Sequence, residues 1–330
     1  MNFFTHKLLA GVLLTGSLLG VSSHSFASEQ AYEVQLKKEG VSPVSYSKTL
    51  ESANKLLPKA KINFDGTSIF TRASDVNALL WDVETGKNKV LTFKYEANTG
   101  AFSPDGKTLF IGSSHYLADT VYLVDVSTGR AIKEFNVESP VWAIAVSADG
   151  TKFATASHSS ARVWDIATGD KIIEIDAKET LSAIALNSDG SILVTGFNNG
   201  NTTIWNAQTG EELLTLREAA SPIANITISP DSSTVFVESW EGARLYDLQT
   251  GTKLHEKRAN TPYGSGILSP DGKTFLIGST DGTATLYDAD SGDELLVLEG
   301  NGEPIYSVGF SGDESTLFTQ TPQTITIYNR

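Results

Sequence analysis

The chain has 330 residues, of which 40% are hydrophobic and only 19% are charged. This balance excludes an intrinsically disordered protein and is typical of a chain with a large buried core. The formal net charge is −14 and no basic cluster offsets it, so neither nucleic acid nor an anionic membrane surface is an expected partner. The chain has no cysteine, so disulfides do not contribute to its stability.

Residues 1–27 have the pattern of a secretory signal peptide. Lys7 precedes an apolar run over residues 8–21, and the small residues Ser25 and Ala27 suit cleavage after Ala27. The alternative, an uncleaved N-terminal anchor, is disfavoured because the run is shorter than the roughly 20 residues of a membrane span. We therefore expect a bacterial protein that is periplasmic or secreted, with no membrane insertion after signal cleavage.

Two short segments follow the signal peptide. Residues 28–43 carry mixed charge and predict a tether, with room for one strand at residues 32–36. Residues 44–50 predict a better strand, because alternation at period two would place four side chains on one face. These are Val44, Tyr46, Lys48 and Leu50.

A repeat occupies the chain from residue 61 to its end. In each unit the third apolar run ends in an acidic or amide residue, and successive anchors of this kind lie 40 to 43 residues apart. So regular a period indicates a repeat architecture. The seven anchors are Asp82, Asp125, Asp165, Asn206, Asp247, Asp288 and Asn329.

Within a unit, short apolar runs alternate with turn signals, such as the Ser-Pro-Asp-Gly sequences at residues 103–106 and 269–272. Four antiparallel strands joined by such turns make one twisted sheet. A single sheet cannot bury both of its faces, whereas sheets stacked around an axis can. We therefore predict an all-β fold, a seven-bladed β-propeller of four-stranded blades over residues 44–330.

The first run of each unit is expected to line the axis, where space is limited. Small residues stand four and two positions before the Ser or Asn that opens the first turn, and larger residues stand between them. Examples are Ala143 and Ala145, Ala183 and Ala185, and Ser307 and Gly309.

The last unit has three runs and no fourth, while residues 44–50 form a strand that belongs to no unit. Leu91, in the fourth run of the first unit, lies one period after this strand. We predict that this N-terminal strand completes the seventh sheet, closes the ring and removes an exposed strand edge.

On these features the chain resembles the WD40-repeat family over residues 44–330. The resemblance rests on the period, the turns, and third runs that end in Trp81-Asp82, Trp164-Asp165, Tyr246-Asp247 and Tyr287-Asp288. It implies a propeller fold and says little about function. YVTN-type and quinoprotein-like bacterial propellers are related alternatives.

The chain also departs from the family pattern. The Gly-His pair that opens many family repeats is absent from all seven units. The acidic residue of the loop after the second strand is clear only at Asp281, with weaker counterparts at Glu241 and Asp75. We therefore expect the buried His–Asp network of the family to be missing.

One end of the propeller should carry the loops between second and third strands together with the links between units. These segments vary in sequence, which suits binding. The second unit is longest here, with 19 residues between Gly106 and Asp125 where other units have 15 or 16. Aromatic and polar side chains at this end predict a protein-binding rim. The candidates are His115, Tyr116, Trp142, His158, Phe197, Asn199, Trp240, Glu241, Tyr263 and Tyr306; packing between sheets is the alternative for Trp142 and Tyr306.

Catalytic and metal sites are weakly indicated. His115 and His158 fall in equivalent loops of adjacent units, but no carboxylate-rich set accompanies them. Asp288, Asp290 and Asp293 imitate a calcium loop, yet the same positions form ordinary turns in other units. Ser265 lacks the glycine pattern of a nucleophile elbow. We expect neither a resident metal nor a cofactor.

The leading functional hypothesis is a non-catalytic, exported scaffold that binds a protein of the cell envelope through this rim. The alternative is a propeller enzyme or redox protein that holds a small ligand or cofactor in the axial channel. A third option is a structural part of an envelope assembly.

Overall fold

The computed structural model describes residues 34–36, 44–52, 56–73, 78–217, 220–258, 265–300 and 302–330. The predicted signal peptide at residues 1–27 lies outside these residues, as does most of the predicted tether. By its internal contacts the chain divides into Met1–Ala31 and Tyr32–Arg330. The second unit contains every described strand.

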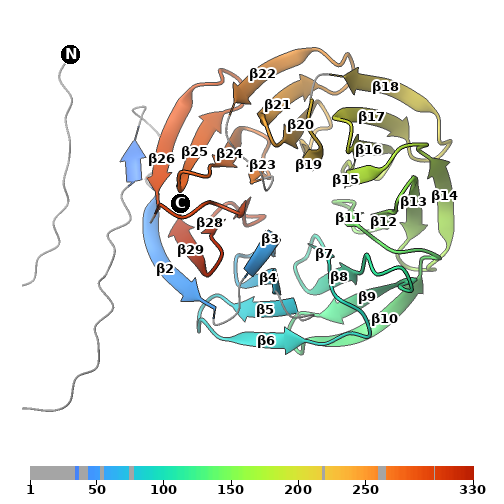
Figure 1. The fold of residues 1–330 in the computed structure, drawn as a ribbon, viewed down its shortest axis with the longest axis horizontal. Helices are drawn as coiled ribbons and strands as arrows, with labels where there is room; N and C mark the ends of the chain where they lie inside the picture. Colours follow the sequence, from blue (N-terminus) through green and yellow to red (C-terminus); the bar gives the residue numbers. More distant parts are fainter. Residues whose placement is uncertain are drawn as a thin grey trace, which may run out of the picture. The chain divides into compact units, whose positions relative to one another are not determined.

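Seven antiparallel sheets surround a central axis and form the blades of a propeller (Figure 1). This confirms the predicted all-β, seven-bladed fold. Blade 1 consists of β3 (Leu56–Ile62), β4 (Ser68–Ala73), β5 (Ala78–Asp82) and β6 (Asn88–Leu91); blade 2 of β7 (Thr99–Phe102), β8 (Thr108–Gly112), β9 (Thr120–Asp125) and β10 (Arg130–Asn136); blade 3 of β11 (Ala143–Val146), β12 (Lys152–Ala156), β13 (Ser160–Asp165) and β14 (Lys171–Asp176).

The remaining blades follow in chain order. Blade 4 consists of β15 (Leu181–Leu186), β16 (Ile192–Phe197), β17 (Asn201–Asn206) and β18 (Glu212–Arg217); blade 5 of β19 (Ile223–Ile228), β20 (Thr234–Ser239), β21 (Gly242–Asp247) and β22 (Lys253–Arg258); blade 6 of β23 (Gly266–Leu268), β24 (Thr274–Gly278), β25 (Thr283–Asp288) and β26 (Glu294–Glu299), with β1 (Val34–Leu36) beside β26; blade 7 of β27 (Ser307–Phe310), β28 (Thr316–Gln320), β29 (Thr324–Asn329) and β2 (Ser45–Glu51).

The hydrophobic core is divided among the junctions between blades. The described residues form seven clusters of buried side chains, and each cluster joins two neighbouring blades. One example packs Val163 and Ile175 of blade 3 against Leu193 and Trp205 of blade 4. Each sheet thus buries its two faces against different neighbours, which is the physical reason that the units form a ring.

Tryptophans of the third strands are anchored inside their own blades. The indole Nε1–H groups of Trp81, Trp164 and Trp205 donate to threonine hydroxyls of the second strand over 2.9, 3.0 and 2.8 Å. The acceptors are Thr71, Thr155 and Thr195. None of the histidines that the structure describes is buried, so the absence of a His–Asp network, expected from the sequence, holds for this part of the chain.

The N-terminal strand closes the ring as predicted. β2 pairs antiparallel with β29, with Leu50 opposite Ile325, so the last blade is built from both ends of the chain. The predicted orientation of its side chains is wrong, however. A β-bulge between Tyr46 and Lys48 shifts the alternation, because one extra residue moves every earlier side chain to the other face. Val44 therefore packs toward blade 6, Leu50 toward blade 1, and Tyr46 is 45% exposed.

A strand within the predicted tether is also present. β1 covers residues 34–36 and pairs with the outer strand of blade 6, with Val34 opposite Leu298. Leu295 is 7% exposed on this strand, whereas Leu254 and Leu213 at the same place in blades 5 and 4 are 44% and 51% exposed. Among the described strands, β1 thus gives blade 6 a fifth strand, and the other blades have four.

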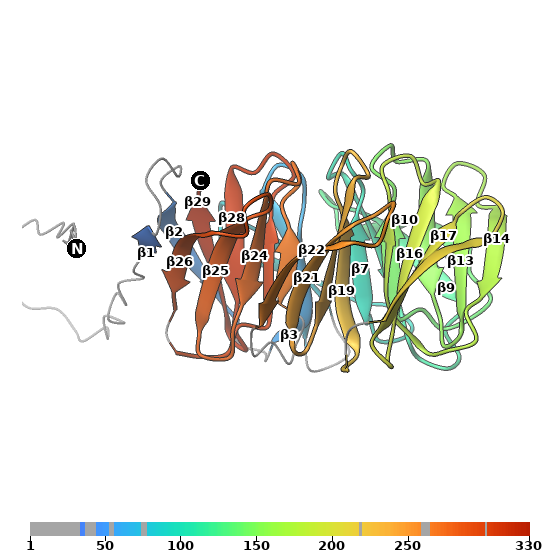
Figure 2. The ribbon, with the colours of Figure 1, turned by 90° about the horizontal axis from the view of Figure 1, so that it is seen from above.

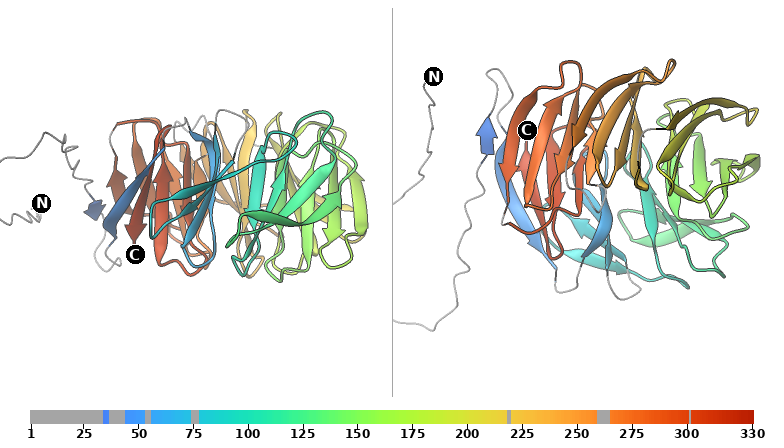
Figure 3. Two further views of the ribbon diagram at one scale, coloured as in Figure 1. Left: turned by 90° about the horizontal axis from the view of Figure 1, so that it is seen from below. Right: turned by 45° about the horizontal axis from the view of Figure 1, so that its top comes forward.

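All blades run their strands between the two ends of the ring (Figures 2 and 3). One end carries the turns after first and third strands, and we call it the turn end. The opposite end carries the loops after second strands and the links between blades. We call it the loop rim.

Candidate binding surface

The turn end is built from stereotyped hydrogen bonds. Asp165 Oδ1 accepts the backbone N–H of Thr168 over 2.8 Å, and this bond is the main reason that the pKa of Asp165 is lowered. Asp288 makes the same bonds to the N–H groups of Asp290 and Ser291. These carboxylates are engaged within their own turns, which agrees with the turn interpretation of Asp288 and leaves them a structural role.

Grooves at the turn end recur with the blades. A groove of about 590 Å³ lies between blades 1 and 2, and its lining includes Asp65, Asp105 and Lys107. A groove of about 530 Å³ between blades 5 and 6 is lined by the equivalent residues, among them Asp231, Asp271 and Lys273. Because the same side chains return at equivalent places, these grooves follow from blade spacing and do not single out a ligand site.

The loop rim is less regular, and blade 2 carries its most exposed aromatic side chain. Tyr116 is 78% exposed and stacks on His115 with ring centroids 4.7 Å apart. On its other side His115 stacks on Tyr95, from the link between blades 1 and 2, at 4.6 Å. Lys94 lies 4.9 Å above the Tyr95 ring. We call these residues, with Leu117 (55% exposed), the blade-2 aromatic cluster.

Hydrogen bonds hold this loop in place. The backbone N–H of Ala118 donates to the carbonyl of His115 over 2.7 Å, and the N–H of Leu117 donates to His115 Nδ1 over 3.2 Å. With Nδ1 acting as the acceptor, a neutral His115 carries its proton on Nε2. Ala118 is buried beneath the loop. The cluster is therefore a preformed surface and presents Tyr116 at low entropic cost.

On blade 3 the rim shows a second aromatic contact. Trp142, half-buried, meets the exposed His158 edge-on with centroids 5.6 Å apart. The two predicted histidines, His115 and His158, thus each pack on a different aromatic partner.

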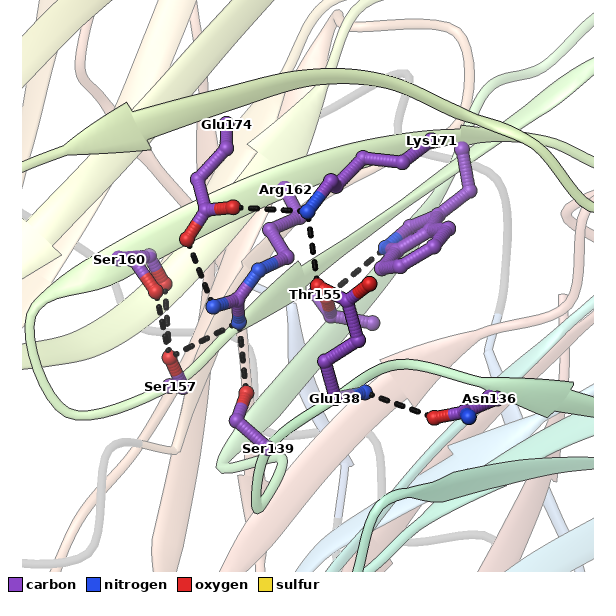
Figure 4. A network of polar contacts seen from close by, with 10 residues as sticks. Asn136, Glu138, Ser139, Thr155, Ser157, Ser160, Arg162, Lys171 and Glu174 are labelled. Atoms are coloured by element: carbon purple, nitrogen blue, oxygen red, sulfur yellow. Dashed lines mark hydrogen bonds and ion pairs between the residues drawn. The ribbon is translucent and has the colours of Figure 1, made fainter.

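The buried Arg162 lies at the base of the same loop, where it reaches Ser157 over 3.4 Å (Figure 4). Its guanidinium donates to Ser139 of the link over 2.6 Å and to Glu174 of the outer strand over 2.7 Å. Lys171 bridges Glu174 and Glu138, at 2.9 and 2.7 Å. This network ties the link, the loop and the outer strand together.

Blade 5 repeats the arrangement with a different residue at the tip. Trp240 and Glu241 form a two-residue loop between β20 and β21, and Trp240 is 50% exposed. Arg244 stands where Arg162 stands in blade 3 and donates to Ser239 over 3.2 Å, with Glu241 at 3.4 Å. Trp240 therefore projects from a supported turn, three blades away from the blade-2 aromatic cluster.

Two predicted rim residues are corrected by the structure. Phe197 is 4% exposed and belongs to the core between blades 3 and 4, and Tyr306 is 8% exposed. Phe197 ends β16, and Tyr306 directly precedes β27. A large ring at such a place gains more by packing than by facing water. Asn199 remains exposed and bonds to Glu179, whereas Tyr263 lies outside the described residues.

The described residues contain no group of three or more His, Cys, Asp or Glu side chains that could hold a metal ion. Within the same part of the chain, no helix is long and apolar enough to cross a membrane. The axial channel contains a cavity of about 250 Å³, lined by the innermost strands.

Comparison with known proteins identifies one unit of the repeat. The family model "WD domain, G-beta repeat" matches residues 129–165, from the turn before β10 to the end of β13. One stretch of the chain matches a WD40 repeat. The matched stretch joins the outer strand of blade 2 to three strands of blade 3, so this unit spans two blades. The same offset explains why the last blade takes its outer strand from the N-terminal part.

Several eukaryotic proteins are similar to the chain at low identity. Eukaryotic translation initiation factor 3 subunit I of Nematostella vectensis is 25% identical over 223 residues, which cover 66% of this chain and 57% of that protein. Serine-threonine kinase receptor-associated protein of Gallus gallus is 25% identical over 238 residues (69% and 65%). The Periodic tryptophan protein 2 homolog of Dictyostelium discoideum is 22% identical over 322 residues (93% and 32%). The chain spans less than two thirds of the length of each of these relatives.

Proposed function

We propose that the chain is a non-catalytic WD40 scaffold that binds another protein through its loop rim. The observation that carries this proposal is Tyr116, a large ring left 78% exposed on a rigid stack with His115 and Tyr95. Exposed aromatic rings on preformed surfaces are typical hot spots of protein interfaces. The names of two relatives, a factor subunit and a receptor-associated protein, describe proteins that act in assemblies.

The proposal assigns separate contacts to separate blades. Tyr116 and Leu117 offer an apolar contact on blade 2, while Trp240 offers one on blade 5 with Glu241 beside it. A hot-spot ring contributes on the order of 2 kcal/mol, so its removal should weaken binding about 30-fold. Loss at one blade alone would indicate a partner that covers part of the rim.

The proposed location is the cell envelope of a bacterium. Its support is the pattern of residues 1–27. The mass of the protein in an envelope fraction tests cleavage after Ala27. A protein that still carries residues 1–27, or a protein that is recovered only from the cytoplasm, would contradict this part of the proposal.

The binding proposal is tested by affinity capture from cells with the wild-type chain and Tyr116→Ala/Trp240→Ala. The matched control is Ile132→Ala/Leu213→Ala, which removes side chains that are 59% and 51% exposed on the outer strands β10 and β18. We expect the rim variant to lose the captured partner and the control to retain it. Equal recovery with all three proteins would exclude the rim as the binding surface.

A further inference from the structure

The residues that line the axial channel are of a different kind in blade 1 than in the other blades. Positions four and two before the first turn hold uncharged residues in blades 2 to 7, such as Ala143 and Ala145 in blade 3. The equivalent positions of blade 1 are Lys59 and Lys61. Both lysines are half-buried, and both line the channel cavity of about 250 Å³.

The strand that carries these lysines is distorted. Lys59 has a φ of 79°, in the left-handed region that disfavours residues with a side chain, and the pairing of β3 with β4 shifts register between Leu57 and Lys61. Ser307 of blade 7 stabilises the distortion, because its Oγ accepts the backbone N–H groups of Lys59 and Ala60 over 2.7 and 3.0 Å. Having accepted two bonds, this hydroxyl still has its own proton to donate.

No described residue neutralises the two ammonium groups by an ion pair. Arg72 on β4 adds a third positive charge. Burial first, and then the charges of Arg72 and Lys61, together lower the pKa of Lys59 to about 8. The acid that acts on Lys61 is Glu238 of blade 5, which is fully buried. Burial raises the pKa of Glu238 to about 8, so at neutral pH this carboxyl is mostly protonated and contributes little negative charge.

Glu238 itself is poorly satisfied. Among the described residues neither of its carboxylate oxygens has a hydrogen bond of normal geometry, although the backbone N–H groups of Gly266 and Ser265 act to lower its pKa. The channel cavity is therefore lined by two lysines without an ion pair and by the Ser307 hydroxyl, while the buried acid Glu238 lies against Gly266, another lining residue. Cationic groups held in a recess of low dielectric attract anions more strongly than exposed ones do.

We propose that the axial channel binds a small dianion, a phosphate or a short dicarboxylate, between the ammonium groups of Lys59 and Lys61. The size of the cavity sets the class of ligand. Pockets for drug-sized molecules measure roughly 300–1,000 Å³, so about 250 Å³ suits a phosphate or a four-carbon dicarboxylate and is too small for a nucleotide. The bound anion would supply the negative charge that the channel lacks.

The rival explanation is that Lys61 and Glu238 form a structural charge pair. The two explanations differ in what removal of the lysines does. A structural pair predicts that Lys61→Met destabilises the fold and that Glu238→Gln restores it. The anion site predicts that Lys61→Met leaves the fold at least as stable as the wild type, because an uncompensated charge is removed, and that it loses ligand binding.

The experiment is isothermal titration of the full-length chain with phosphate and, separately, with succinate, at pH 7 and low ionic strength. The channel variant is Lys59→Met/Lys61→Met. Its control is Lys107→Met/Lys273→Met, which removes two exposed lysines from turns outside the channel. We expect saturable binding of at least one probe to the wild type and the control, and an affinity at least tenfold lower for the channel variant. Lys61→Arg should retain binding, because it keeps the charge.

Two results would overturn the proposal. One is an unchanged affinity in the channel variant, which would place the anion elsewhere on the surface. The other is the absence of saturable binding of either probe up to roughly 10 mM, a limit beyond which affinity is negligible. Thermal unfolding of each variant shows whether it is folded, and a Lys61→Met protein that melts early and is restored by Glu238→Gln would favour the structural pair.

Discussion

Gly266 lies directly against Glu238, so that a Cβ added to Gly266 would come within 3.0 Å of the Glu238 carboxyl carbon. At the equivalent junction between blades 4 and 5 the small and the large residue change places. There the glycine, Gly196, is on the second strand, and a Cβ added to it would meet Ile226 of the first strand at 3.0 Å. The junction of blades 5 and 6 thus leaves room for a carboxyl group where another junction is filled by a hydrocarbon. An apolar contact has been replaced by a buried acid, which lowers stability unless the acid stays protonated.

Glu238→Gln should make the fold more resistant to alkaline pH. The folded-state pKa of Glu238, about 8, is above the ordinary value of 4.5, so the stability linked to its protonation is present below pH 4.5 and is lost as the pH rises toward 8. The loss is at most about 1.4 kcal/mol per pH unit in that window. Urea unfolding at pH 5, 7 and 9 should therefore show a smaller decrease for the variant. Parallel pH profiles for the two proteins would show that Glu238 is not the group that titrates.

Removal of the N-terminal strand should destabilise the ring. Deletion of residues 44–52 exposes the edge of β29 and removes Leu50 and Val44 from two core clusters, at an expected cost of several kcal/mol. Leu50→Ala alone should cost about 2–5 kcal/mol, because the side chain is 3% exposed. Tyr46→Ala, at a side chain 45% exposed, is the control and should cost less than about 1 kcal/mol. Equal melting temperatures for the deletion and the wild type would contradict closure by β2.

The buried hydrogen bond of Trp164 should be sensitive to its acceptor. In the wild type the Trp164 indole N–H donates to Thr155 Oγ1 over 3.0 Å. Thr155→Val preserves the shape of the side chain but leaves this N–H without its acceptor. The expected loss is about 1–3 kcal/mol in chemical denaturation. Thr155→Ser keeps the oxygen and loses only a methyl group, so it should be the milder change. The reverse order would mean that packing, not the hydrogen bond, makes Thr155 important.

Lys59→Met should stabilise the folded chain at neutral pH. The pKa of Lys59 is lowered to about 8 from 10.5, so its charged form costs stability in full below pH 8, and the cost shrinks as the pH rises toward 10.5. The variant should therefore have a higher thermal midpoint at pH 7 and approach the wild type near pH 10. A lower midpoint at pH 7 would show that the charge is compensated in the folded state.

Most of the architecture could be predicted from the sequence repeat, for a physical reason. A period of 40 to 43 residues sets the strands of each blade, and small residues such as Ala143 and Ala145 predicted the channel because crowding at the axis admits little else. Closure of the ring by the N-terminal strand was also predictable, because the last unit has only three apolar runs. The bulge in β2 was not predictable from alternation, and it reversed the side on which Val44 packs.

The rim was predicted less well, because exposure depends on neighbours far away in sequence. Phe197 looked like a loop residue, yet the adjacent blade covers it. Tyr95 was missed although it stacks on His115, since their contact joins a link to a loop 20 residues further along the chain. A signal for the channel site did exist in the sequence: Lys59 and Lys61 occupy positions that hold uncharged residues in every other unit.

The most direct test of the binding account is site-specific photo-crosslinking in cells. A photoreactive amino acid replaces Tyr116 on the loop rim, and in a second strain it replaces Leu213, which is also exposed (51%) but lies on an outer strand. Binding through the loop rim predicts that position 116 crosslinks to a specific protein, which mass spectrometry identifies. The same protein should not crosslink to position 213. No adduct at position 116, or the same adduct from both positions, would contradict it.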